Sequence, residues 1–170
     1  MSASSAAYSF ERLADQDRAS FHCGVSELDD YLSHRAGQDA KRKVAAPFVL
    51  VDESRRILAY YTLSAYTVRL TDLPAQLAKK LPRYPLIPAT LLGRLAVSRE
   101  HQGLKLGSLV LMDALHRSWK STAEVASTGV VAEAINEAAR QFYLHHEFIP
   151  FAGHPRKLFI PMAIVGKAFR

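Results

Sequence analysis

The sequence predicts an α/β fold, more narrowly an α+β mixed sheet with helices on its faces. Segments with the alternating pattern of strands are interspersed with segments of helical period, in the order β-α-β-β-α-β-α-β-β. The chain has 170 residues, of which 49% are hydrophobic and 22% charged, as in ordinary globular proteins. A chain of this length buries about two-thirds of its unfolded surface. We therefore expect a single domain, 1–170, without internal repeats or flexible linkers.

The first half of the chain predicts one strand, one helical region and a hairpin. Tyr8 to Leu13 alternates loosely and is typical of a strand. Ser26 is expected to open a helix with its hydroxyl as the cap, and Asp29 completes a capping-box pattern. Phe48 to Val51 and Ile57 to Val68, separated by a polar turn, predict an antiparallel hairpin. The residues expected on the buried face of the helix are Val25, Leu28, Leu32, Ala36 and Ala40.

The second half predicts helices and strands in alternation. Pro74 suits the first turn of a short helix over Leu73 to Leu81. A helix that ends at about Lys120 is apolar nearly all round, which predicts burial on more than one side. Asn136 is a good N-cap for a helix through about His145. The predicted strands are Leu91 to Val97, Gly129 to Ala134, Phe148 to Phe151 and Leu158 to Ile164.

Composition bounds the class of protein and its partners. The single cysteine, Cys23, cannot form an internal disulfide, which favours a reducing compartment. No stretch approaches the roughly 18 apolar residues of a membrane span, and Met1 to Ala7 lacks the pattern of a signal peptide, so we expect a cytoplasmic protein. The net charge is +6, with −1 over residues 1–45 and +7 over residues 46–170. A basic surface attracts nucleic acid, anionic lipid or a phosphorylated cofactor, although many basic proteins bind no nucleic acid.

Several common catalytic motifs are missing from the sequence. There is no G-x-S-x-G elbow, no G-x-x-x-x-G-K-[ST] phosphate loop and no H-E-x-x-H motif. His145 and His146 are adjacent and so point to different faces of a helix, and we expect no metal site. Cys23 is expected to be a buried or incidental thiol, because no basic cluster surrounds it.

The segment from Leu95 to Gly107 combines a buried strand, a tight turn with two glycines and a helix start. Backbone amides at a helix start are unpaired and carry partial positive charge, and glycine lets a ligand approach them closely. Such a unit binds pyrophosphate, and Lys105 would add a full charge. The alternative is that Gly103 and Gly107 only shape the turn.

A second informative segment runs from Asn136 to Tyr143. Ala139 and Tyr143 are four residues apart and share a helix face, where the small side chain leaves room for a ligand. A tyrosine with a pKa of about 10 suits the protonation of a departing thiolate, whose conjugate acid has a pKa of about 8.5. The alternative is a core tyrosine packed beside Phe142.

Together, these two segments resemble the GNAT family of acyl-CoA N-acyltransferases. The family pattern Q/R-x-x-G-x-G/A falls on Gln102, Lys105 and Gly107, with Lys105 in place of the middle glycine. The family segment N-x-x-A-x-x-[FL]-Y-x-x-x-G-F falls on 136–148, with Glu147 in place of the glycine.

Further segments narrow the resemblance to the toxin-type GNATs of bacterial toxin–antitoxin pairs, over about Phe21 to Met162. They are Phe21-His22-Cys23-Gly24, Leu28-Asp29, Tyr31-Leu32, Ala36, Ile87-Pro88, Leu92 to Val97, Leu111 to Leu115, and Leu158 to Met162.

The resemblance implies a GNAT domain with a mostly antiparallel central sheet, which transfers an acetyl group from acetyl-CoA to an amine. In toxin-type members the acceptor is the α-amino group of an aminoacyl-tRNA, and its acetylation blocks translation. A cognate DNA-binding antitoxin and a homodimer are implied as partners, with no metal and no membrane. Two alternatives stay open: acetylation of a small amine or a protein amine, and a degenerate module that binds CoA or only a partner.

The resemblance also assigns residues. Tyr143 would be the general acid, and a strand amide near Ala96 or Val97 would stabilise the carbonyl oxygen. The expected acetyl-CoA contacts are Leu95, Ala96, Val97, Gln102, Gly103, Leu104, Lys105, Leu106, Gly107, Ser108 and Asn136. Clustering, and for Arg94 proximity to the reactive strand, suggest tRNA contacts at Lys41, Arg42, Lys43, Arg83 and Arg94. The alternatives are a solvated helix end for the first three and a core-edge residue paired with a carboxylate for Arg94.

Overall fold

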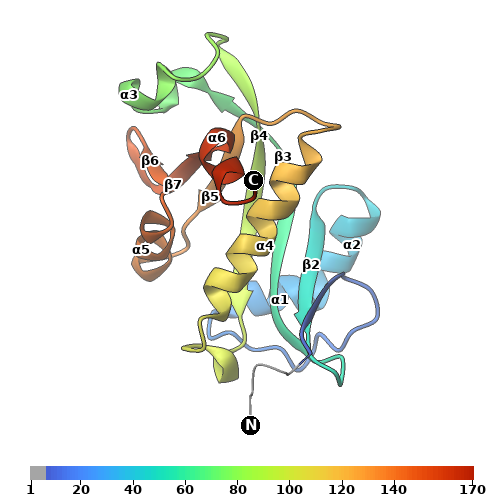
Figure 1. Ribbon diagram of the computed structural model, residues 1–170. Coiled ribbons are helices and arrows are strands. Elements are labelled where there is room, and N and C mark those ends of the chain that lie inside the picture. The colour runs from blue at the N-terminus through green and yellow to red at the C-terminus, as the bar shows by residue number, and fades with distance from the viewer. Residues whose placement is uncertain (1–6) are drawn as a thin grey trace. The chain divides into compact units, whose positions relative to one another are not determined.

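The computed structural model describes residues 7–170, in which strands and helices are interspersed along the chain (Figure 1). The strands are β1 (Ser9–Arg12), β2 (Ala46–Val51), β3 (Ile57–Arg69), β4 (Leu86–Val97), β5 (Gly129–Glu133), β6 (Ile149–Phe151) and β7 (His154–Pro161). The α-helices are α1 (Ser26–His34), α2 (Ala36–Lys41), α3 (Ala75–Ala78), α4 (Leu106–Ser121), α5 (Glu137–His145) and α6 (Met162–Lys167). Two short 3-10 turns are η2 (Leu70–Asp72) and η3 (Arg99–His101).

The strands form one mixed sheet in the order β1-β2-β3-β4-β5-β7-β6. β4 and β5 run parallel, with Leu91 opposite Val131, and helix α4 makes the connection that a parallel pair requires. The pairs β1–β2, β2–β3, β5–β7 and β6–β7 are antiparallel. The predicted α/β fold with a mostly antiparallel sheet is therefore confirmed.

The chain divides into two compact units. The first comprises the described residues up to Leu63 together with Arg94–Ala114, and the second comprises Ser64–Gly93 together with Leu115–Arg170. β3, β4 and α4 each continue from one unit into the other. The expectation of a single domain over 1–170 stays a prediction.

The core of the first unit forms where α1 and α2 pack against β2, β3 and β4. Tyr31 and Leu32 on α1 are almost fully buried, as are Val49 on β2 and Tyr60 on β3. The ring of Phe21 meets that of Tyr60 edge-on at 5.6 Å. Each such apolar side chain contributes about 1.5–3 kcal/mol when fully buried.

The predicted capping of the first helix is wrong. Val25 is the N-cap and makes no side-chain cap bond, and Ser26 is the first helical residue, so its hydroxyl lies past the cap position. The carboxylate of Asp29 reaches back instead and accepts the Cys23 N–H at 2.9 Å. The helical region is also interrupted at Arg35, whose φ of −124° separates α1 from α2.

The second unit has its own core. Val68 on β3, Ile87 on β4, Val131 on β5 and Phe159 on β7 are nearly inaccessible, and Leu77 of α3 packs on them. The predicted helix at α5 is confirmed and ends at His145 as expected. The helix predicted over Leu73 to Leu81 is shorter, because α3 spans Ala75–Ala78 with Pro74 as its N-cap.

Two expectations about the second half need correction. α4 buries one broad face, made by Leu106, Val110, Leu111, Ala114, Leu115 and Ser118, whereas Leu109 is 43% exposed and Leu104 precedes the helix. The helix is therefore not buried on more than one side. The last strand ends at Pro161, which is the N-cap of α6, so residues 162–164 belong to that helix rather than to the strand.

Candidate functional site

The predicted pyrophosphate turn lies where β4 runs into α4. Leu95, Ala96 and Val97 end the strand, η3 follows, and Gln102, Gly103, Leu104 and Lys105 lead to Leu106, Gly107 and Ser108 in the first helical turn. Two backbone bonds fix the start of the turn: Ser98 N–H donates to Leu58 O at 2.8 Å, and Arg99 N–H donates to His22 O at 2.7 Å. The structure thus brings these predicted cofactor residues together in one unit.

The backbone of this turn has the form that an anion site needs. Gly103 has a φ of +86°, and a Cβ at that position would meet no atom within 4 Å, so this side of the turn is open. Lys105 has a φ of +63° and an exposed side chain without an ion pair among residues 7–170. α4 begins directly after it, so the partial positive charge of the helix start and the ammonium lie on adjacent residues. These features fit the pyrophosphate of acetyl-CoA.

Gln102 holds the turn in place. Its Nε2 donates to the carbonyl oxygen of Cys23 at 2.8 Å and to that of Val97 at 3.0 Å. The side-chain amide N–H groups are therefore engaged within the protein, and Gln102 acts as a positioning residue for the turn.

Cys23 itself is buried, and burial raises the pKa of its thiol to about 11, so it stays a neutral thiol at pH 7 as the sequence predicted.

The second predicted segment lies in the other unit, on α5. The Asn136 side-chain oxygen accepts the Ala139 N–H at 2.9 Å, which confirms the predicted N-cap. Tyr143 is buried, and its ring packs between Phe142 and Phe148 at centroid distances of 5.4 and 5.1 Å. Within residues 7–170 its hydroxyl has no hydrogen-bond partner. Burial raises the pKa of Tyr143, so the hydroxyl keeps its proton throughout the physiological range.

The end of α5 fixes the position of the Tyr143 ring. Phe148 N–H donates to Tyr143 O at 3.1 Å and Glu147 N–H donates to Leu144 O at 3.1 Å. With Glu147 in the left-handed region at a φ of +73°, these bonds form a Schellman motif. The apolar contact that accompanies this motif is the one between the rings of Phe148 and Tyr143.

Arg94 does not pair with a carboxylate within the described chain, which makes that alternative wrong. Its guanidinium carbon lies 3.5 Å from the centroid of the Tyr31 ring, in a cation–π contact. The Tyr31 hydroxyl donates to Asp39 Oδ2 at 2.8 Å, and burial together with this bond raises the pKa of Tyr31 to about 12. Sequence reasoning missed the contact between Tyr31 and Arg94. The local signal at Tyr31 was its four-residue spacing from Arg35, whose guanidinium carbon lies 5.7 Å from the centroid of the same ring.

The other predicted tRNA contacts are exposed. Lys41, Arg42 and Lys43 lie at the end of α2, and Arg83 lies between α3 and β4. None of the four has an ion pair among the residues that the structure describes. Basic residues at a helix end are also favoured by the helix dipole, so the placement fits both readings of residues 41–43.

No cluster of three or more His, Cys, Asp or Glu side chains within residues 7–170 is arranged to hold a metal ion, and no helix there has the length and apolarity to cross a bilayer.

Comparison with known proteins identifies the family. No model of a protein family matches the sequence. A tRNA-acetylating toxin of Mycobacterium tuberculosis, however, is 33% identical over 138 residues, which are 81% of this chain and 81% of the toxin. The chain belongs to the toxin-type GNAT acetyltransferases.

Solved structures of toxin-type GNATs superimpose on nearly the whole chain. A tyrosine-to-phenylalanine mutant of KacT matches with a TM-score of 0.89 at 29% identity, over 95% of this chain and 99% of that one. AtaT complexed with acetyl-methionyl-tRNAfMet matches with a TM-score of 0.88 at 30% identity, over 96% and 100%. Mutant AtaT bound to the C-terminus of the antitoxin AtaR and acetyl-CoA gives a TM-score of 0.82 at 28% identity, over 95% and 98%, and the AtaT–AtaR complex has also been seen bound to DNA.

The two departures of this GNAT from the family pattern share one feature. Lys105 and Glu147 stand where the pattern has glycine, and both keep the left-handed backbone that glycine adopts most easily, with φ of +63° and +73°. The turn before α4 and the Schellman motif after α5 therefore keep their form without glycine.

Proposed function

We propose that this chain is an acetyl-CoA-dependent N-acetyltransferase, a toxin that acetylates the α-amino group of an aminoacyl-tRNA and so blocks translation. The observation that carries the proposal is its 33% identity with a tRNA-acetylating toxin over 81% of both chains. The likeness to AtaT, solved with acetyl-methionyl-tRNAfMet, supports the same acceptor. An acetylated α-amine is no longer a nucleophile, so its amino acid cannot be added to a growing peptide.

Acetyl-CoA would supply the activated acetyl group, and the turn between β4 and α4 would hold its pyrophosphate. The backbone N–H groups at the start of α4 would bind the phosphate oxygens, with the Lys105 ammonium beside them. Gly103 keeps the approach open, because no atom lies within 4 Å of the position a Cβ would take. Gln102 would keep the turn attached to Val97 and Cys23 while the cofactor binds.

The acceptor amine needs little activation. A free α-amine has a pKa of about 7.7–8.0 and is partly neutral at pH 7, so positioning would supply most of the rate. A backbone N–H near Ala96 or Val97 would donate to the carbonyl oxygen as negative charge develops on it. Tyr143 would pass its hydroxyl proton to the departing thiolate sulfur and recover a proton from solvent or from the acetylated amine. Burial raises the pKa of Tyr143, which keeps the hydroxyl in the donor form at pH 7 but makes it a weaker acid, so the role rests on its place in the family segment.

The tRNA would be held by basic side chains. Lys41, Arg42, Lys43 and Arg83 are exposed and unpaired in the described chain, which suits phosphate contacts. Arg94 is stacked on Tyr31 through its flat face, so its edge N–H groups remain available for a bidentate contact with phosphate. We further propose a cognate antitoxin that binds DNA, by analogy with AtaR, and a homodimer as the assembled form.

Mass spectrometry of bulk charged tRNA, after incubation with the purified chain and acetyl-CoA, tests the proposal. N-acetylated aminoacyl-tRNA is the expected product, and the acetylated amino acid identifies the substrate. Tyr143→Phe is the matched control, because it keeps the ring packing and removes only the hydroxyl. No acetylated product despite measurable acetyl-CoA binding would favour a small amine or a protein amine as acceptor. Absence of both would leave only a partner-binding module.

A further inference from the structure

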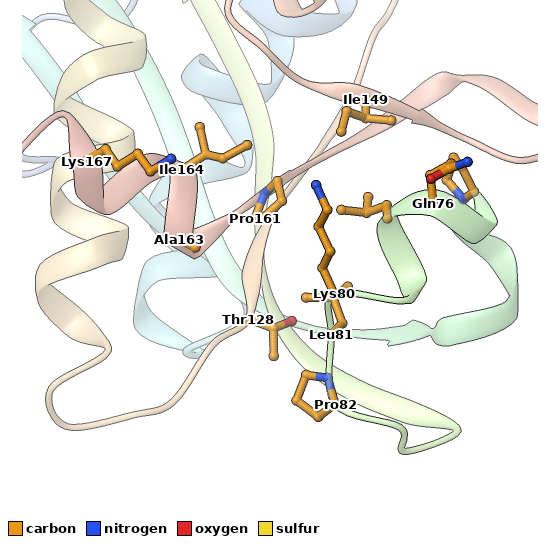
Figure 2. A pocket seen from close by; sticks show the side chains of 12 residues that line it. Gln76, Lys80, Leu81, Pro82, Thr128, Ile149, Pro161, Ala163, Ile164 and Lys167 are labelled. Atoms are coloured by element: carbon orange, nitrogen blue, oxygen red, sulfur yellow. The ribbon is translucent and has the colours of Figure 1, made fainter.

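A groove in the second unit has no part in the proposed chemistry. It has a volume of about 560 Å³ and lies between α6 and the segment made by α3 and the residues that follow it. Figure 2 shows Ala163, Ile164 and Lys167 on the α6 side, facing Lys80 and Leu81 on the other. We propose that this α3–α6 groove is a docking site for an acidic, amphipathic segment of the cognate antitoxin. The inference rests on the proposed function, which supplies that partner.

The lining of the groove is mainly apolar and partly open to solvent. Leu77 and Pro161 are buried, whereas Leu81, Ile149 and Ile164 are only half-buried. Contiguous apolar surface left open on a folded chain marks an interaction site more often than a scattered apolar residue does. A helix or extended segment with apolar side chains on one face buries them in a groove of this kind.

The charge of the groove selects an acidic occupant. Lys80 and Lys167 are exposed, and neither has a carboxylate or a hydrogen-bond acceptor among the described residues. No aspartate or glutamate lines the groove. Two free ammonium groups on opposite walls therefore favour a segment that carries carboxylates beside its apolar side chains.

The same lining argues against RNA as the occupant. Binding of single-stranded RNA relies on aromatic platforms and on several phosphate contacts. No aromatic side chain lines the groove, and only two cations do. Arg83, the tRNA candidate that lies in the same unit, does not line the groove.

The test measures the affinity of the antitoxin encoded beside this chain for groove variants, by isothermal titration calorimetry with the full chain. Lys80→Glu combined with Lys167→Glu changes exposed side chains only, so it should fold normally, and we expect affinity to fall at least about tenfold. Ile164→Asp places a charge against the apolar lining and should weaken binding at least about thirtyfold. Matched controls are Lys120→Glu and Val125→Asp, exposed positions outside the groove, with an expected change below about twofold.

Acetylation of tRNA without antitoxin is measured for every variant and should equal that of the unmodified chain. Wild-type affinity in the double lysine variant would overturn the docking site, as would no binding of the antitoxin to the unmodified chain. A change in sedimentation of the double variant without antitoxin, at unchanged antitoxin affinity, would assign the groove to a second copy instead. Loss of acetylation in the unmodified chain with antitoxin binding intact would refute the proposed function alone.

Discussion

Replacement of Lys105 separates the two things that this residue contributes, a left-handed backbone and a positive charge. Its φ of +63° lies in the region that costs a non-glycine residue about 1–2 kcal/mol. Glycine removes that cost. It also gives the unfolded chain more conformational entropy, which lowers the free energy of unfolding by about 0.5–1 kcal/mol. Alanine keeps the backbone cost, and both replacements remove the ammonium. The pair Lys105→Gly and Lys105→Ala therefore differs in the backbone contribution alone.

The difference can be measured as stability. We expect Lys105→Gly to exceed Lys105→Ala by about 0.5–1 kcal/mol in free energy of unfolding. For a chain of this size that is a shift of about 1–4 °C in the melting temperature, measurable by differential scanning fluorimetry. In acetyl-CoA affinity the two variants should agree, because both lack the charge. Each should bind about two- to fivefold more weakly than the unmodified chain, the effect of one exposed charge beside a helix start.

Glu147 supplies the comparison outside the turn. Its φ of +73° predicts the same order of stability, Glu147→Gly above Glu147→Ala, but neither change removes a charge from the pyrophosphate turn. Acetyl-CoA affinity should therefore stay within about twofold of the unmodified value in both variants. Equal stability of the glycine and alanine variants at Lys105 would refute the backbone argument. An unchanged acetyl-CoA affinity at Lys105 would remove its ammonium from the cofactor site.

Four further predictions follow from the described contacts. Tyr143→Phe should lower kcat for acetylation about 10²–10⁴-fold with acetyl-CoA affinity unchanged, and near wild-type kcat in a steady-state assay would remove its role as general acid. Because burial raises the pKa of Tyr143 above its unfolded value of about 10, folding stability should decline as the pH rises past that value, and Tyr143→Phe should lessen the decline in alkaline melts. Reversal of Lys41, Arg42 and Lys43 to glutamate should weaken tRNA binding and flatten its dependence on salt, and an unchanged slope in filter-binding assays would exclude these residues from the interface. Asn136→Ala removes the cap bond of α5 and should cost about 1 kcal/mol in chemical denaturation, whereas Asn136→Asp should retain most of it.

Local signals in the sequence predicted the parts of the site that depend on neighbouring residues. Asn136 caps α5, and the turn from β4 into α4 has glycine where the backbone is open, because both are set within a few residues. The Ser26 cap failed for a local reason as well. The helix begins with Ser26 itself, and Asp29 satisfies an amide further back instead.

Other features depend on residues far apart in the chain and could not be predicted from spacing. The stacking of Arg94 on Tyr31 joins β4 to α1, and the buried face of α4 is decided by what packs against it rather than by how many apolar residues it carries. The α3–α6 groove is likewise lined mainly by segments that precede β4 in the sequence and segments that follow β5. Sequence periodicity describes each segment separately, so it does not predict contacts between segments that are distant in the sequence.

The departures from glycine at Lys105 and Glu147 do not favour a degenerate acyltransferase. The direction of a backbone N–H is set by φ and ψ, and both residues keep a left-handed φ. The larger side chains therefore affect the stability of the fold more than the direction of the backbone N–H groups. At Lys105 the extra side chain ends in a charge of the sign that pyrophosphate requires. At Glu147 the Schellman bonds still close, and the ring contact between Phe148 and Tyr143 is retained. The two segments on which acetyl transfer would depend therefore have the backbone form of the family pattern despite both replacements.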